Sequence, residues 1–142
     1  MQESYVELQD IPVMRVRADM ERGGPAEAMN LLESKLSTLR GRKFYGIFRE
    51  TPKGEEYYAC VAQVDADDPG RMQLETGVIP GGKFVRCKVQ DWESVIRAGQ
   101  LPKLFHELEL AHPHEADPAR FSVEFYRSQS ELQLLLPVIQ KT

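Results

Sequence analysis

Hydrophobic and polar residues alternate in two short segments of the chain, Met14–Ala18 and Val85–Val89. Alternation with a period of two residues is typical of a strand that buries one face. After both segments the spacing of apolar residues changes to three and four, which indicates an amphipathic helix. The first predicted helix spans residues 25–40, and the second spans residues 92–108 with an interruption at 99–102.

Each predicted helix is followed by two more segments typical of strands, so the order β-α-β-β occurs twice. These segments are Phe44–Arg49 and Tyr57–Val64 in the first half, and Phe121–Tyr126 and Leu132–Ile139 in the second. Matching residues support a repeat, because Arg15 and Arg86 are 71 positions apart and Phe44 and Phe121 are 77 apart. The sequence therefore predicts an α+β fold made of two duplicated units, with helices on one face of an antiparallel sheet.

A polar stretch at residues 65–71 lies between the two halves. We interpret it as the boundary between unit one, about residues 3–65, and unit two, about residues 72–142. The 142 residues include 42% hydrophobic and 28% charged residues, a balance typical of one globular domain over residues 1–142.

Composition and charge argue against several classes of protein. No segment approaches the roughly 18 apolar residues of a membrane-spanning helix, and the first residues lack the pattern of a secretory signal. The formal net charge of −4 argues against nucleic-acid binding through a basic surface. Cys60 and Cys87 fit no disulfide or zinc pattern, so we expect two buried thiols in a cytoplasmic protein.

The alternation also predicts which side chains point away from the helices. In the strand after the first helix these are Tyr45, Ile47 and Arg49, and in its counterpart they are Ser122, Glu124 and Tyr126. The first strands of the two units add Arg15, Arg17, Phe84, Arg86 and Lys88 to the same face. Exposure to solvent is the ordinary explanation for any one of them. Aromatic rings gathered around Glu124, however, are typical of a small-molecule site.

Five motifs occur in order along the chain: Phe44–Ile47 with Glu50–Pro52, Tyr57–Cys60, Ile79–Phe84, Val123–Tyr126 and Leu134–Ile139. In these motifs the chain resembles the GyrI-like small-molecule-binding domain, also called the bacterial transcription activator effector-binding domain. The resemblance covers most of the chain. It implies two β-α-β-β units related by pseudo-two-fold symmetry, an SHS2-like duplication, with a ligand groove between them.

The resemblance also implies a kind of ligand. Members of the family commonly bind drug-like aromatic compounds, often cationic, and the family's Glu-x-Tyr motif matches Glu124 and Tyr126. A carboxylate between aromatic rings neutralises a buried cation, and each ring face adds roughly 0.5–2 kcal/mol of cation–π attraction. The predicted ligand-binding residues are Glu124, Tyr126, Tyr45, Tyr58, Phe84 and Trp92.

Two features depart from the family pattern. Its regulators carry a DNA-binding module ahead of this domain, whereas here the domain begins at about residue 3, so we expect a stand-alone form without direct DNA binding. The predicted ligand face also carries five cations, Arg15, Arg17, Arg49, Arg86 and Lys88. They either pair with acidic neighbours or favour an anionic ligand, and whether they line the groove stays open.

Three functions are compatible with these observations. We favour a small-molecule-binding or sensing module, of the multidrug-binding kind found in transcription regulation. The second is a hydrolase that opens strained small molecules, with Glu124 as general base and Tyr126 orienting water or substrate. The third is a protein-interaction role, with a regulatory protein or gyrase as partner. We expect no cofactor and no metal, because His106, His112 and His114 match no zinc-site spacing.

Overall fold

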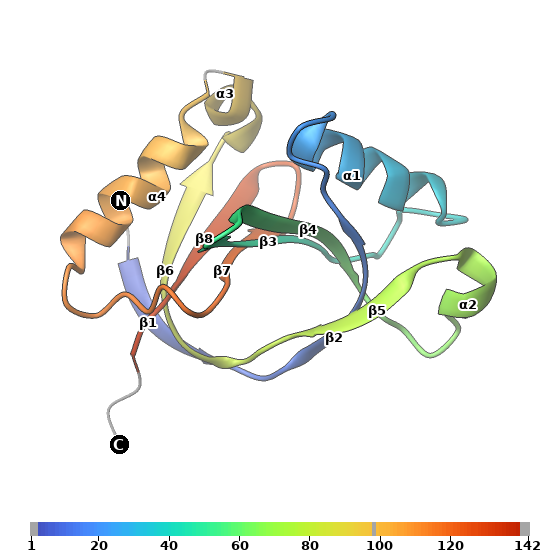
Figure 1. Cartoon of the computed structure of the whole chain (residues 1–142), viewed down its shortest axis with the longest axis horizontal. Helices are drawn as coiled ribbons and strands as arrows, with labels where there is room; N and C mark the ends of the chain where they lie inside the picture. The colour runs from blue at the N-terminus through green and yellow to red at the C-terminus, as the bar shows by residue number, and fades with distance from the viewer. Residues whose placement is uncertain (1–2, 98, 140–142) are drawn as a thin grey trace.

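The computed structural model describes residues 3–97 and 99–139, and it confirms the α+β class: one antiparallel sheet with helices on one side (Figure 1). The strands of the first half are β1 (Glu3–Leu8), β2 (Ile11–Arg17), β3 (Phe44–Thr51) and β4 (Gly54–Ala62). Those of the second half are β5 (Glu75–Ile79), β6 (Gly82–Gln90), β7 (Ser122–Tyr126) and β8 (Glu131–Pro137). The helices are α1 (Gly24–Ser34), α2 (Pro69–Met72), α3 (Trp92–Arg97) and α4 (Leu101–Ala111), and none of these described helices is long and apolar enough to cross a membrane.

Both predicted helices form, but the first is shorter than its apolar pattern suggests. α1 ends at Ser34, whose hydroxyl donates to a carbonyl oxygen within the helix over 2.6 Å. Ser37 and Thr38 follow, and such side chains compete for backbone hydrogen bonds, as Thr38 Oγ1 does by accepting from the Arg40 N–H. The second helix is interrupted as predicted, because the chain adopts a φ of 68° at Gly99 between α3 and α4.

The order of the strands has the same pattern from either edge of the sheet. The order is β1-β6-β8-β7-β3-β4-β2-β5, so β1, β2, β3 and β4 occupy the same places in one half as β5, β6, β7 and β8 in the other. Each half therefore contains the predicted β-α-β-β unit, with one further strand at its start. This arrangement agrees with the predicted repeat.

The pairing of the strands gives the spacing between equivalent residues. Leu8 pairs with Gly82, and Ile11 pairs with Ile79. The residues 71 positions after Leu8 and Ile11 are Ile79 and Gly82, so the two pairs are equivalent at the predicted spacing of 71. In the centre of the sheet β3 pairs with β7, and Gly46 lies opposite Glu124, 78 positions later in the chain. The predicted spacing of 77 for this strand is therefore wrong by one residue.

An error of one residue in a strand reverses the face of every side chain. The prediction is right for β3, where Phe44 and Phe48 pack with the helix-side clusters. It is wrong for β7, where Val123 and Phe125 belong to the cluster on the opposite face. Glu124 and Tyr126, the residues of the Glu-x-Tyr motif, therefore lie on the side of the sheet that carries the helices.

Apolar clusters cover both faces of the central strands. Under α1, Ala28 and Leu32 pack with Met14, Ala59 and Val61. Under α4, Phe105 and Leu108 pack with Val85, Leu132 and Leu134. The third cluster lies on the opposite face and contains Val13, Tyr45, Ile47, Tyr58, Cys60, Ile79, Phe84, Val123 and Leu135. Because both faces are buried, apolar pattern alone does not show which face the helices cover.

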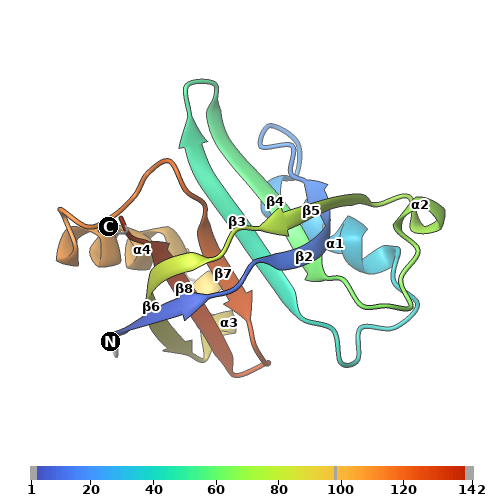
Figure 2. The ribbon, with the colours of Figure 1, turned by 90° about the horizontal axis from the view of Figure 1, so that it is seen from below.

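β1 and β2 form one long bent segment, and β5 and β6 form a second one. The two segments pair with each other beneath the central strands (Figure 2). At the bend, Gly81 lies against the chain that joins β1 to β2. Its N–H donates to Asp10 Oδ1 over 2.7 Å. A Cβ atom at Gly81 would overlap the Leu8 carbonyl oxygen and would lie 2.7 Å from the Gln9 carbonyl carbon. Only glycine fits this close approach of two backbones.

His112, which follows α4, links the first strand to the second half of the chain. Its Nε2 lies 3.1 Å from Glu3 Oε2, and its Nδ1 lies 3.2 Å from Glu115 Oε1. The Tyr5 hydroxyl donates to the same Glu115 carboxylate over 2.9 Å. Burial acts to lower the pKa of His112, but the hydrogen bonds to Glu115 and Glu3 outweigh it and raise the pKa above its usual value.

We expect the free energy of unfolding to fall with rising pH because of this histidine. A raised pKa in the folded state gives a stabilising contribution that is complete below about pH 6.5, the unfolded value, and is lost as pH rises through the folded value. Urea unfolding across this range measures it. The variant His112→Gln is expected to lose this component, whereas His106→Gln, at an exposed position, keeps it. An unchanged pH dependence in His112→Gln would contradict the assignment.

Candidate functional site

A cavity of about 1350 Å³ lies on the helix-bearing side of the sheet, between α1 and the α3–α4 segment. Figure 1 shows these helices above the central strands, with α1 to the right and α3 and α4 to the left. The floor of the cavity consists of Phe44, Phe48, Tyr57, Glu124 and Tyr126, and its walls include Met29 and Glu33 from α1 and Trp92, Phe105 and Glu109 from α3 and α4. The cavity is therefore aromatic at its floor and carries carboxylates from both halves of the chain.

Glu124 lies at the centre of the floor, and its residue is only 6% exposed. The Tyr57 hydroxyl donates to Glu124 Oε1 over 2.8 Å, and the Tyr126 hydroxyl donates to the same oxygen over 2.9 Å. Tyr57 comes from β4 and Tyr126 from β7, so two strands position the carboxyl group. Among the described residues, no hydrogen bond reaches the second oxygen, Oε2.

Burial dominates the acid–base properties of this group. It raises the pKa of Glu124 above its usual value, because removal from water disfavours the charged carboxylate. The two tyrosine hydroxyls act in the opposite direction and reduce this shift, while the nearby Glu55 adds to it. Burial also raises the pKa values of Tyr57 and Tyr126, so both remain neutral hydrogen-bond donors.

Gly46 makes room for the glutamate on the neighbouring strand. It lies opposite Glu124 in the β3–β7 pair, and a Cβ atom at this position would overlap Tyr57 Oη and Glu124 Oε1. A side chain here would displace both hydrogen-bonding partners, since these are the atoms it would meet first. The glycine is therefore part of the site, although it presents no chemical group.

Gly46→Ala is expected to lower the free energy of unfolding by about 2 kcal/mol, the usual range for an additional methyl group in a packed interior. The clashing atoms are the ends of side chains and can move, so we expect a folded protein with the Tyr57–Glu124 hydrogen bond displaced. Urea unfolding measures the effect. Gly70→Ala is the matched control, because its Cβ would meet only Asp68 Oδ1, at 3.8 Å. Equal stability of the two variants would contradict the close contact.

Trp92, the first residue of α3, lines the cavity beside Tyr126. Its ring meets the Tyr126 ring edge to face, with centroids 5.3 Å apart. The indole N–H donates to the Ser128 carbonyl oxygen over 2.8 Å, which holds the side chain against the turn after β7. Trp92, Tyr126 and Glu124 therefore form a continuous surface of two rings and one carboxyl group.

The charges that line the cavity are unequal. Its lining residues include seven carboxylates, Glu33, Glu50, Glu55, Glu93, Glu109, Asp117 and Glu124, and four arginines, Arg42, Arg49, Arg120 and Arg127. Three of the arginines pair with carboxylates that do not line the cavity, since Arg42 contacts Asp67, Arg49 contacts Glu56 and Arg127 contacts Glu131. Arg120 donates to the carbonyl oxygens of Lys83 and Val138. The cavity therefore carries an excess of negative charge.

Of the predicted ligand-binding residues, the structure brings together Glu124, Tyr126 and Trp92. Tyr45, Tyr58 and Phe84 lie on the opposite face of the sheet. Tyr45 stacks on Phe125 there, with centroids 4.7 Å apart. The expectation that Tyr45 and Phe84 share one face with Glu124 is therefore wrong, and Tyr58 does not line the cavity. The physical reason is the one-residue error in β7, which placed Glu124 on the wrong face.

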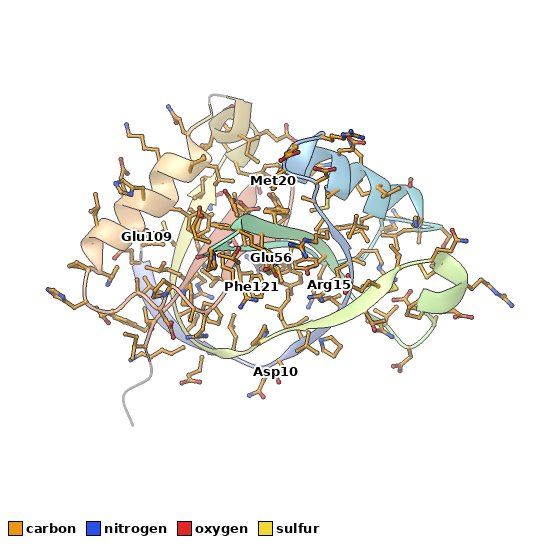
Figure 3. All side chains as sticks on the ribbon, in the orientation of Figure 1. Asp10, Arg15, Met20, Glu56, Glu109 and Phe121 are labelled. Atoms are coloured by element: carbon orange, nitrogen blue, oxygen red, sulfur yellow. The ribbon has the colours of Figure 1, made fainter. Side chains whose placement is uncertain are left out.

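Four of the five cations of the predicted ligand face lie outside the cavity lining. Arg15, Arg17, Arg86 and Lys88 do not line the cavity, and Arg49 reaches its edge. The Arg15 guanidinium lies 4.1 Å from the Tyr58 ring centroid and 3.1 Å from Glu75, and Arg49 lies over the Phe121 ring. Figure 3 shows Arg15, Glu56 and Phe121 on the side of β3 and β4 away from the helices. These arginines therefore pack against aromatic rings of the opposite face.

Sequence reasoning missed three parts of the site: Tyr57, Gly46 and the α1 wall. Tyr57 and Tyr58 are neighbours in β4, and successive side chains of a strand point to opposite faces. Which tyrosine lines the cavity therefore depends on which face of β4 each one occupies. A glycine within an apolar strand is a signal of close approach by another group, and Gly46 could have been identified in this way. The expectation that Cys60 and Cys87 are buried is confirmed.

Neither a protein-family model nor a curated protein sequence matches this chain. Similar solved structures exist. SAV2435, in a structure bound to tetraphenylphosphonium, has a TM-score of 0.63 at 12% identity, over 98% of this chain and 94% of that chain. The EcmrR C-terminal domain has a TM-score of 0.63 at 12% identity, over 99% and 98% of the two chains. A hydrolase from Listeria innocua has a TM-score of 0.60 at 11% identity, over 97% and 92%.

These likenesses extend over almost the whole chain at low sequence identity, so they concern the fold. They agree with the resemblance to GyrI-like effector-binding domains noted in the sequence. The chain thus has the fold that these solved structures share.

Proposed function

We propose that the protein is a small-molecule-binding or sensing module that takes hydrophobic aromatic cations into the cavity between α1 and α4. The observation that carries this proposal is the buried Glu124 carboxyl group, which lies beneath aromatic rings and has no cationic partner among the described residues. Such a group is the natural partner of a cation that has lost its own water.

The charge of the cavity supports a cation over an anion. Carboxylates outnumber arginines along its lining, and three of the four arginines are occupied by carboxylates outside it. The rings of Tyr57, Trp92 and Tyr126 add cation–π attraction, and their apolar surfaces favour a ligand that itself carries rings. The structure of SAV2435 with tetraphenylphosphonium gives an example of such a cation bound to the same fold.

A pair of ions with equal shape and opposite charge tests the proposal. Tetraphenylphosphonium is expected to raise the Tm, and a ligand at 100 times its Kd adds roughly 2.7 kcal/mol of apparent stability. Tetraphenylborate, its anionic counterpart, is expected to have no such effect. Equal or stronger stabilisation by tetraphenylborate would overturn the choice of a cation, and no stabilisation by either ion would overturn the binding function.

A hydrolase acting on strained small molecules is the second candidate. The raised pKa of Glu124 favours it, because a general base works best when its pKa lies near the working pH. The likeness to the Listeria innocua hydrolase adds support from the fold alone. Mass spectrometry of compounds that raise the Tm distinguishes the two functions, since a binding module returns them unchanged and a hydrolase consumes them.

A partner such as a regulatory protein or gyrase stays a prediction of the sequence. We extend the proposal to a cytoplasmic location, which the buried Cys60 thiol favours because thiols persist in a reducing compartment.

A further inference from the structure

We propose that Glu124 holds a proton while the cavity is empty and that a cationic ligand displaces it, so that binding of the cation releases one proton. This inference rests on the proposed function and adds its regulation by pH. The reaction is balanced in charge: the neutral acid and the ligand cation become the carboxylate–cation pair and one free proton. The proton that leaves is the one on the carboxyl group.

Glu124 has no counter-ion within reach among the residues that the structure describes. No ion pair to Glu124 is found among the described residues, and the arginines at the edge of the cavity contact Asp67, Glu56 and Glu131 instead. An ionised carboxylate that is buried without a partner is strongly disfavoured, and such groups usually take up a proton.

The hydrogen bonds of Glu124 distinguish its two oxygens. Tyr57 and Tyr126 both donate to Oε1, which suits the carbonyl oxygen of a neutral carboxylic acid. Oε2 receives no hydrogen bond from a described residue and is left to carry the proton. Both hydroxyls act to lower the pKa of Glu124, but burial outweighs them and raises it above its usual value.

The charged and titratable groups that line the cavity set the electrostatic surroundings of this carboxyl group. They are Arg49 and Glu50 from β3, Glu55 and Tyr57 from β4, Tyr126 from β7, Glu33 from α1, Glu93 from α3, and His106 and Glu109 from α4, with Arg42, Asp117, Arg120 and Arg127 from the adjoining loops. The carboxylates outnumber the arginines, and Glu55 in particular raises the pKa of Glu124. This surrounding charge therefore favours the protonated form.

The ligand reverses this balance. A cation next to Oε2 favours the charged carboxylate, as any opposite charge at close range does. Linkage then requires that affinity for a permanent cation falls by about tenfold for each unit of pH below the pKa of ligand-free Glu124, and becomes constant above it. The site would therefore bind its ligand more weakly in an acidified cell.

Isothermal titration calorimetry with tetraphenylphosphonium tests the coupling, because this ion cannot itself take up or lose a proton. Titrations at one pH in two buffers of different ionisation enthalpy give the number of protons released. We expect a value approaching one at about pH 5 and falling as pH rises to about 8. Glu124→Gln is expected to release no proton and to bind with an affinity independent of pH. Glu55→Gln is the matched control and is expected to keep the release.

Binding by the wild-type protein without proton release across this range would overturn the inference while leaving the proposed function intact. Proton release that persists in Glu124→Gln would overturn it as well. Infrared difference spectra of the ligand-free wild-type and Glu124→Gln proteins test it independently of any ligand. We expect the carbonyl band of a protonated carboxyl group in the wild type alone, and its absence at about pH 5 would show an ionised Glu124 and overturn the inference.

Discussion

Glu124→Gln is expected to weaken tetraphenylphosphonium binding by roughly thirtyfold at about pH 8, a loss of about 2 kcal/mol. The amide keeps the shape of the neutral acid, and its oxygen can accept from both Tyr57 and Tyr126. It cannot balance the charge of a desolvated cation. We therefore expect stability without ligand to be unchanged or increased, so that reduced affinity reports the missing charge. Calorimetric titration and urea unfolding measure the two effects.

The matched control is Glu109→Gln, which removes an exposed carboxylate from the cavity wall on α4. We expect its effect on affinity to be within about threefold, because charges exposed to water interact weakly. If both variants lose affinity equally, the general charge of the cavity controls binding. That result would contradict a specific role for Glu124.

Gly81→Ala is expected to cause the largest loss of stability, about 3 kcal/mol, at the upper end of the usual cost of overpacking. Its Cβ would overlap the Leu8 carbonyl oxygen, and 2.7–2.8 Å would separate it from backbone atoms of Gln9 and Asp10. Backbone atoms cannot rotate away as side-chain ends do. The bend that joins β5 to β6 must therefore open, and the Gly81–Asp10 hydrogen bond is lost with it.

Urea unfolding measures this effect, again with Gly70→Ala as the control. We expect the control to remain within about 1 kcal/mol of the wild type, the usual scale for a compatible Gly-to-Ala change. Wild-type stability of Gly81→Ala would contradict the close approach of the two bent segments.

The general architecture could be predicted from the sequence because the spacing of apolar residues changes in the same way in both units, from two residues in a strand to three and four in a helix. The spacing of 71 between Arg15 and Arg86 agrees with the pairing of β1 and β2 with β6 and β5. The six residues of α3 account for most of the larger spacing later in the chain. They occur only in the second half, where they bring Trp92 to the cavity.

The face of β7 could not be predicted, for a physical reason. Its sequence places Val123 and Phe125 on one side and Tyr126 on the other, so both faces carry large apolar side chains. The matched phenylalanines Phe44 and Phe121 suggested the wrong register by one residue. The long-range pairing of Gly46 with Glu124 decides it, and a local pattern contains no record of that pairing.

The cavity depends on tertiary structure for the same reason. Tyr57 and Glu124 are 67 residues apart, and their hydrogen bond forms because β4 and β7 flank β3 in the sheet. The sequence resemblance identified Glu124 and Tyr126 through a motif, whereas Tyr57 had no motif to distinguish it from Tyr58.

A crystal structure of the protein with tetraphenylphosphonium shows directly on which face of the sheet the cation binds. We predict that the phosphonium centre lies next to Glu124 in the cavity between α1 and α4, with its rings against Tyr57, Trp92 and Tyr126. Binding on the opposite face of the sheet, beside Tyr45, Tyr58 and Phe84, would contradict the account.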